Sequence, residues 1–164
     1  MKFSANQIEL QKSLNYCQGV IEKRSTLPIL SNILLDVKNS ELVITATDLD
    51  LIFIHKIENV EVINEGKTTT SSSIMYDIVR KFSSGKIINL NLTDASKLQL
   101  ESEKSIFNLN CINSSEFPLT DENFNQNEFS IKSKQLLKLL NKCKFSVSND
   151  ETRHYLTGIF FHQT

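Results

Sequence analysis

The 164-residue sequence predicts an α+β protein, on three observations. Several segments rich in Ile, Leu, Val and Thr alternate in polarity with a period of two, as half-buried strands do. Three other segments repeat apolar residues every three or four positions, as amphipathic helices do. Finally, FSIKSKQLLKLLNKC at residues 129–143 is similar to FSANQIELQKSLNYC at residues 3–17, which indicates an internal repeat.

The first two predicted helices each place a basic residue on the face opposite the core. One is predicted from about Gln7 to Glu22, and Lys12 lies roughly 200° around the helix axis from its apolar stripe. The other is predicted from Ser73 to Phe82, with Arg80 pointing outward. The residues expected to face inward are Leu10, Leu14, Cys17 and Ile21 in the first helix and Ile74, Met75, Ile78 and Phe82 in the second.

A third helix is predicted after residue 132, and its outer face carries a row of lysines at i, i+4 and i+8. No acidic residue interrupts this row, which favours contact with a polyanion, although a solvated lysine face is the common arrangement on a surface helix. The lysines are Lys134, Lys138 and Lys142, and the apolar seam comprises Leu136, Leu140, Cys143 and Val147.

The remaining segments predict strands, separated by turn-forming pairs such as Asn39-Ser40. The expected order is strand, helix, three strands, helix and three strands, after which the pattern begins again. The six strands between and after the helices are expected at residues 29–37, 42–48, 49–57, 86–92, 97–102 and 105–111.

The repeat predicts two domains. A shift of 126 positions, without gaps, aligns ten identical residues between positions 3 and 35 and their counterparts. A repeat of this length has the size of a domain, so we expect a first domain at residues 1–126 and the start of a second at 127–164. Its 38 residues are too few to close a core, which suggests that the chain is truncated.

Bulk composition excludes several classes of protein. The net charge is −1, from 18 basic and 19 acidic residues, so binding to nucleic acid would require charges gathered on one surface. Neither a signal peptide nor a membrane-spanning run is recognisable. The widely spaced cysteines predict reduced thiols in the cytoplasm, with Cys17 and Cys143 buried on apolar helix faces.

Catalytic and metal-binding motifs are not recognisable, so we expect a protein that is not an enzyme and needs no cofactor. EGKTTT at residues 65–70 ends like a phosphate-binding loop, but it lacks the earlier glycine. Asp48 and Asp50 form a candidate acid–base or metal-binding pair, although a corner between strands explains Asp48 equally well. The three histidines have no metal-ligand spacing.

Four segments together resemble the bacterial DNA polymerase III beta subunit, the sliding clamp. They are RSTLPILSNILLDV at 24–37, ITATDLDL at 44–51, SEFP at 115–118 and ETRHYLTGIFF at 151–161. The resemblance is colinear across the whole chain. It implies a DNA-clamp fold, in which each domain has two strand-helix-three-strand halves, with helices lining a ring of two chains and antiparallel sheets outside.

The resemblance also implies roles for the basic residues. Lys12, Arg80, Lys134, Lys138 and Lys142 would face duplex DNA, and Arg24 would contact DNA from a loop at the ring face. Such contacts to phosphates do not read sequence. The family usually has proline after this arginine, whereas this chain has Ser25, and Ser73 stands where some members carry a basic residue.

Two protein-binding sites follow from the same resemblance. Phe107 and Leu109 would lie at the seam of the homodimer, although alternation also allows both to be core residues. Arg153, Tyr155 and Leu156 would begin the pocket that binds peptide motifs of the replicative polymerase and the clamp loader. Because most of this pocket would lie beyond Thr164, we expect weak peptide binding and no ring from these 164 residues alone.

Two alternatives remain open at this point. A stand-alone α+β protein could use the same lysines to bind nucleic acid, and would then bind linear DNA strongly without a loader. A small-molecule enzyme built around Asp48 and Asp50 would depend on those carboxylates.

Overall fold

The computed structural model describes residues 1–21, 27–118, 129–150 and 152–162. The chain divides into two compact units, Met1–Thr120 and Asp121–Thr164. The predicted domain boundary near residue 126 lies outside the described residues, as does Arg24.

The first unit consists of two similar halves, each a strand, a helix and three strands, with one additional short strand. The first half comprises β1 (Lys2–Asn6), α1 (Gln7–Cys17), β2 (Asn32–Lys38), β3 (Glu41–Thr47) and β4 (Ile52–Ile57). After β5 (Glu61–Asn64), the second half comprises β6 (Gly66–Ser71), α2 (Ser72–Val79), β7 (Ile87–Asp94), β8 (Lys97–Ser102) and β9 (Ser105–Ile112).

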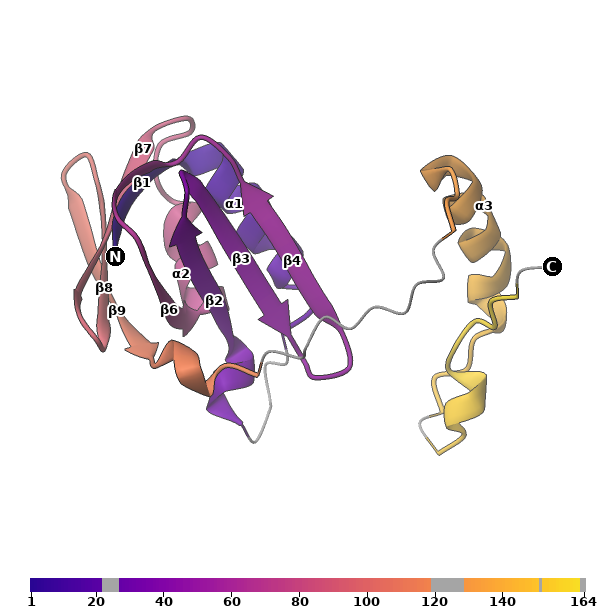
Figure 1. Ribbon diagram of the computed structural model, residues 1–164. Coiled ribbons are helices and arrows are strands. Elements are labelled where there is room, and N and C mark those ends of the chain that lie inside the picture. Colours follow the sequence, from indigo (N-terminus) through magenta and orange to yellow (C-terminus); the bar gives the residue numbers. More distant parts are fainter. Residues whose placement is uncertain (22–26, 119–128, 151, 163–164) are drawn as a thin grey trace. The chain divides into compact units, whose positions relative to one another are not determined.

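The two halves exchange their first strands within one antiparallel sheet, ordered β4-β3-β2-β6-β9-β8-β7-β1-β5 (Figure 1). β1 pairs with β7 of the other half, and β6 pairs with β2. β6 and β9 join the two sides of the sheet through only two register pairs. Side chains reinforce this joint, because Thr69 Oγ1 donates to the Ile112 carbonyl at 2.7 Å and Thr70 Oγ1 to that of Asn110 at 3.1 Å.

Helices α1 and α2 lie together against the sheet and enclose the core of the first unit (Figure 1). The predicted stripe of α1 is confirmed, since Leu10, Leu14, Cys17 and Ile21 are all buried. The α1 helix itself ends at Cys17, earlier than predicted. Beyond it, Gly19 N–H and Val20 N–H bond to carbonyls three residues back, which tightens the chain into turns.

The core-facing side of α2 differs from the prediction. Ile74 is 52% exposed, so the expectation that it faces inward was wrong. The helix is short and begins at Ser72, with Ser71 as its N-cap. Its buried side is formed at i, i+3 and i+7 by Ser72, Met75 and Val79.

Three strand predictions also need correction. Pro28–Ser31 form a 3-10 turn, η1, in place of the expected start of a strand. Residues 49–51 form the turn before β4, because the Thr47 hydroxyl and the Asp48 carboxylate accept backbone N–H groups there. Strands β5 and β6 were not among the predicted strands, and β6 is the half-buried strand that contains most of EGKTTT.

The second unit contains α3 (Ser133–Cys143) followed by two 3-10 turns, η3 (Lys144–Ser146) and η4 (His154–Leu156). Shifting the bounds of α1 by 126 positions gives the bounds of α3, so the two helices occupy equivalent places in the repeat. None of its described residues is buried, and the predicted seam is at most half-buried. Cys143 is exposed, so its predicted burial was wrong, because this part of the chain encloses no core.

Across the described residues, no helix combines the length and the apolar character that crossing a membrane would require.

Candidate functional site

The basic residues of the two helices in the first unit are exposed, as their spacing predicted. Lys12 lies on α1. Asn6 caps the start of this helix, because the Asn6 side chain accepts a hydrogen bond from Ile8 N–H at 2.9 Å. Arg80 follows the last residue of α2, and its side chain is 49% exposed. The buried stripes of α1 and α2 therefore turn Lys12 and Arg80 toward solvent.

Arg80 does not stand free in solvent. Its Nη2 lies 3.0 Å from Asp77 Oδ1, one helical turn back. Its guanidinium carbon also lies 5.7 Å from the centre of the Tyr76 ring, within the range of a cation–π contact. The basic residue predicted to point outward from this helix is thus paired with an acidic neighbour on the same helix.

Helix α3 carries an exposed row of basic residues. Lys134, Lys138 and Lys142 are all exposed, and the helix sequence SKQLLKLLNKC contains no acidic residue. Side chains four positions apart lie along one face of a helix. The three lysines therefore form a basic row with no acidic residue in the same helix, which is suited to the evenly spaced phosphates of a nucleic acid backbone.

Strand β9 has a largely open edge. It pairs with β8 from Ser105 to Asn110 but with β6 only near its end, at Cys111 and Ile112. Phe107 is 38% exposed, and its ring packs edge-on against Phe82 with centroids 5.7 Å apart. Leu109 is a core residue instead, at 6% exposure. Of the two residues predicted at a seam, only Phe107 presents a substantial apolar surface.

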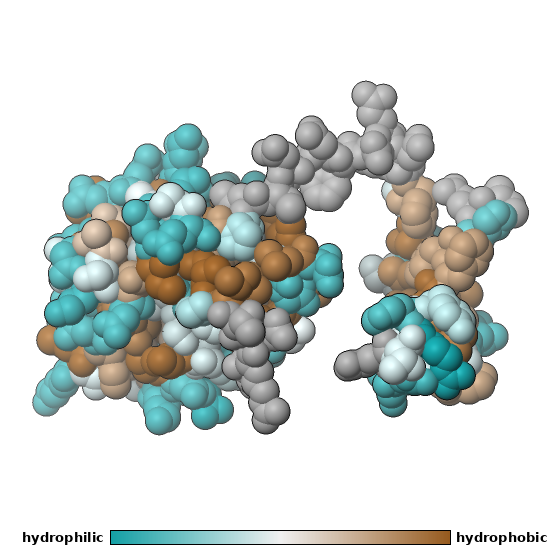
Figure 2. Space-filling view, turned by 90° about the horizontal axis from the view of Figure 1, so that it is seen from below, coloured by the Kyte–Doolittle hydropathy of each residue, from teal (hydrophilic) through white to brown (hydrophobic). Residues whose placement is uncertain are grey.

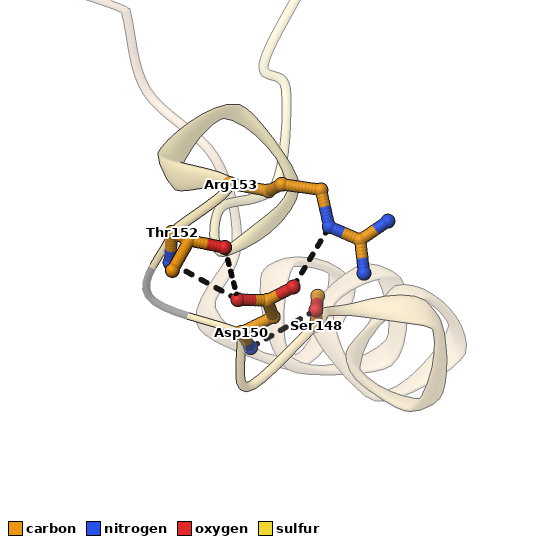
Figure 3. Close-up of polar contacts among 4 residues, drawn as sticks. All are labelled: Ser148, Asp150, Thr152 and Arg153. Carbon is orange, nitrogen blue, oxygen red and sulfur yellow. Dashed lines mark hydrogen bonds and ion pairs between the residues drawn. The ribbon is translucent and has the colours of Figure 1, made fainter.

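The segment around Arg153 is organised by one carboxylate (Figure 3). Asp150 Oδ1 accepts from Thr152 Oγ1 at 2.6 Å and from Thr152 N–H at 3.1 Å, while Oδ2 accepts from Arg153 Nε at 2.8 Å. These bonds hold the pKa of Asp150 below its usual value, with the Thr152 hydroxyl as the largest cause. The side chains of Tyr155 and Leu156 remain exposed.

Of the two aspartates considered as a catalytic pair, Asp48 has a structural role in the β3–β4 turn. Asp48 Oδ1 accepts from Asp50 N–H at 3.1 Å and from Leu51 N–H at 2.7 Å. These are the bonds of an Asx turn, and they support Leu49 at a φ of 84°. Within the described parts of the chain, no group of three or more His, Cys, Asp or Glu residues could hold a metal ion.

Apolar residues also gather on the side of the first unit that faces the viewer in Figure 2. One hollow of the first unit is formed by η1, the β3–β4 turn and the end of β9. The sequence did not predict this hollow, because its lining comes from segments that are far apart in sequence. Its lining residues are Leu27, Pro28, Ile29, Leu49, Ile112, Glu116 and Pro118.

The family model of the DNA polymerase III beta subunit, N-terminal domain, matches residues 1–121. The chain belongs to this sliding-clamp family. The beta sliding clamp of Caulobacter vibrioides is 34% identical over 164 residues, covering 99% of this chain and 44% of the relative. That of Escherichia coli is 30% identical over 161 residues, again covering 44% of the relative.

Solved structures of the family agree with the fold. A crystal structure of the Caulobacter crescentus beta sliding clamp superposes with a TM-score of 0.94 at 32% identity, over 99% of this chain and 43% of the clamp. A sliding clamp of Bartonella birtlesii gives the same TM-score at 34% identity. The predicted DNA-clamp fold is therefore confirmed, and this chain spans less than half the length of the clamps that it matches.

Proposed function

We propose that this chain is an N-terminal part of a sliding clamp, the non-catalytic processivity factor that encircles duplex DNA and tethers the replicative polymerase. Its domains would be residues 1–126 and the start of a second domain at 127–164. Membership of the family supports this proposal, and the basic row Lys134, Lys138 and Lys142 is the structural observation that carries it.

The DNA contact follows from the charge distribution. With a net charge of −1, the chain has little bulk attraction for DNA, so contact depends on the helix faces. Lys12, Arg80 and the α3 row would stand near phosphates, with Arg24 adding a contact from its loop. Weak, sequence-independent contacts suit a clamp, because a ring held by enclosure must still slide.

The protein contacts follow from two exposed features. Phe107, on the open edge of β9, would meet a partner subunit of the homodimer, with Leu109 supporting the strand from the core. Arg153, Tyr155 and Leu156 would begin the peptide pocket for the polymerase and the clamp loader, with Asp150 fixing the arginine.

Binding of a fluorescent linear duplex at several salt concentrations tests the DNA contact. We expect weak binding, and replacing Lys134, Lys138 and Lys142 with Gln should remove most of it. The slope of log K against log salt should fall by about 2 to 3 for three lost phosphate contacts. The matched control replaces Lys38, Lys56 and Lys97, which lie exposed on strands, with Gln.

An equal loss in the control would show attraction by bulk charge and contradict the proposed interface. Tight binding to linear DNA that persists at physiological salt would favour a stand-alone DNA-binding protein, because a clamp relies on enclosure. Weak binding that depends only on the α3 lysines supports the clamp.

A further inference from the structure

Helices α2 and α3 differ in whether an acidic side chain on the same helix lies next to the basic residues. On α3, no acidic side chain lies within the helix to neutralise the lysines. On α2, Asp77 lies 3.0 Å from Arg80, and both side chains are about half exposed. The first unit thus offers DNA an arginine that already has a carboxylate partner.

The ion pair between Arg80 and Asp77 is weak enough for Arg80 to change its partner. Exposed ion pairs contribute little to stability because water screens them and the side chains lose freedom. A DNA phosphate can therefore take Arg80 from Asp77 at small cost, but the carboxylate competes with the phosphate for the guanidinium. The Tyr76 ring, 5.7 Å away, supports the guanidinium in its paired position.

We propose that Asp77 is a positioning residue that holds Arg80 along α2 and so limits the grip of the first unit on duplex DNA. This inference rests on the proposed clamp function. A limited grip is useful there, since each firm phosphate contact adds to the resistance against sliding.

The first test is D77N in the 164-residue chain, measured on the same linear duplex. Releasing Arg80 should tighten binding about twofold to fivefold at low salt and steepen the salt slope by about 1, for one added phosphate contact. D77E keeps a carboxylate within reach of Arg80 and should bind like the original protein. Because Asp77 is exposed, neither change should unfold α2, which circular dichroism can verify.

The matched control is D36N, which makes the same change in net charge elsewhere. Asp36 pairs with Lys67 at 2.7 Å on strands β2 and β6. Its neighbours Leu35 and Val37 belong to the core beneath the helices, so strand alternation places Asp36 on the opposite face of the sheet. D36N should leave DNA binding unchanged, and equal tightening in D36N would overturn the proposal.

A double-mutant cycle separates positioning from simple repulsion. If Asp77 acts by holding Arg80, D77N should have no effect on binding in an R80Q background. A full gain in that background would show that Asp77 acts alone, and no gain from D77N in the original background would also overturn the proposal. If DNA binding proves insensitive to the α3 lysines, the proposed function fails, irrespective of the cycle.

Discussion

Gln7 links the two helices of the first unit, because its Nε2 donates to the Val79 carbonyl oxygen at 3.0 Å. The side chain is 2% exposed and also donates to Gln11 Oε1 at 2.7 Å. Its own Oε1 has no hydrogen-bond partner among the described residues. The amide therefore serves as a donor at the place where α1 begins and α2 ends.

Gln7 variants should separate the donor from the bulk of the side chain. Q7E should destabilise the first unit by about 3 to 5 kcal/mol, because a buried carboxylate would face two acceptors. Q7M removes the donor together with the unpartnered acceptor, and Val79 O still accepts from Phe82 N–H. It should therefore cost only about 1 kcal/mol.

Urea denaturation at neutral pH measures the free energy of unfolding of both Gln7 variants. Equal costs for Q7E and Q7M would contradict the donor role, since both variants keep a side chain of similar length.

The three cysteines should react with a thiol reagent at clearly different rates. Burial raises the pKa of Cys17 to about 12, which keeps its thiol neutral and shielded. Burial also raises the pKa of the half-buried Cys111, whereas Cys143 is exposed on α3. Because the thiolate is the reactive form, Cys143 should be labelled first, Cys111 more slowly, and Cys17 only after unfolding.

Mass spectrometry of timed alkylation at mildly alkaline pH gives the labelling order, and the same reaction in denaturant provides the control. Early labelling of Cys17 in the folded protein would show that the core around α1 opens readily.

Acid should release the segment around Arg153. Bonds from Thr152 and Arg153 hold the pKa of Asp150 below its usual value. A carboxylate with a lowered folded-state pKa stabilises its surroundings above its unfolded-state pKa and loses that effect as pH falls through the folded value. The bonds from Thr152 and Arg153 to the Asp150 carboxylate should therefore persist at neutral pH and be lost as the pH falls through its lowered pKa.

NMR titration of the Thr152 amide proton follows this change. D150N should abolish the titration and free the Arg153 side chain already at neutral pH. A Thr152 shift that titrates at the ordinary carboxylate pKa would contradict the bonding in Figure 3.

Periodicity alone identified the parts of the site that lie on a single helix. The buried stripe of α1 and the exposed row on α3 follow from 3.6 residues per turn, which needs no knowledge of neighbouring elements. The residues of the family resemblance likewise pointed to the correct fold before any geometry was known.

Contacts between segments distant in sequence decided the rest. Phe107 and Leu109 lie on the same face of β9, so alternation cannot tell which of them is exposed. That depends on which elements cover each part of the strand. The missed strand β6 joins the two sides of the sheet because Thr69 meets Ile112, 43 positions later. Burial of Gln7 likewise requires α2 to lie against α1.

The sequence by itself therefore determined the apolar stripe of α1, the basic row on α3 and the family to which the chain is similar. Only the tertiary structure decided that Ile74 faces solvent, that Leu109 is core and that Gln7 is buried against α2. The physical reason is that local periodicity specifies which side of an element is apolar, whereas burial and pairing depend on what the rest of the chain places against it.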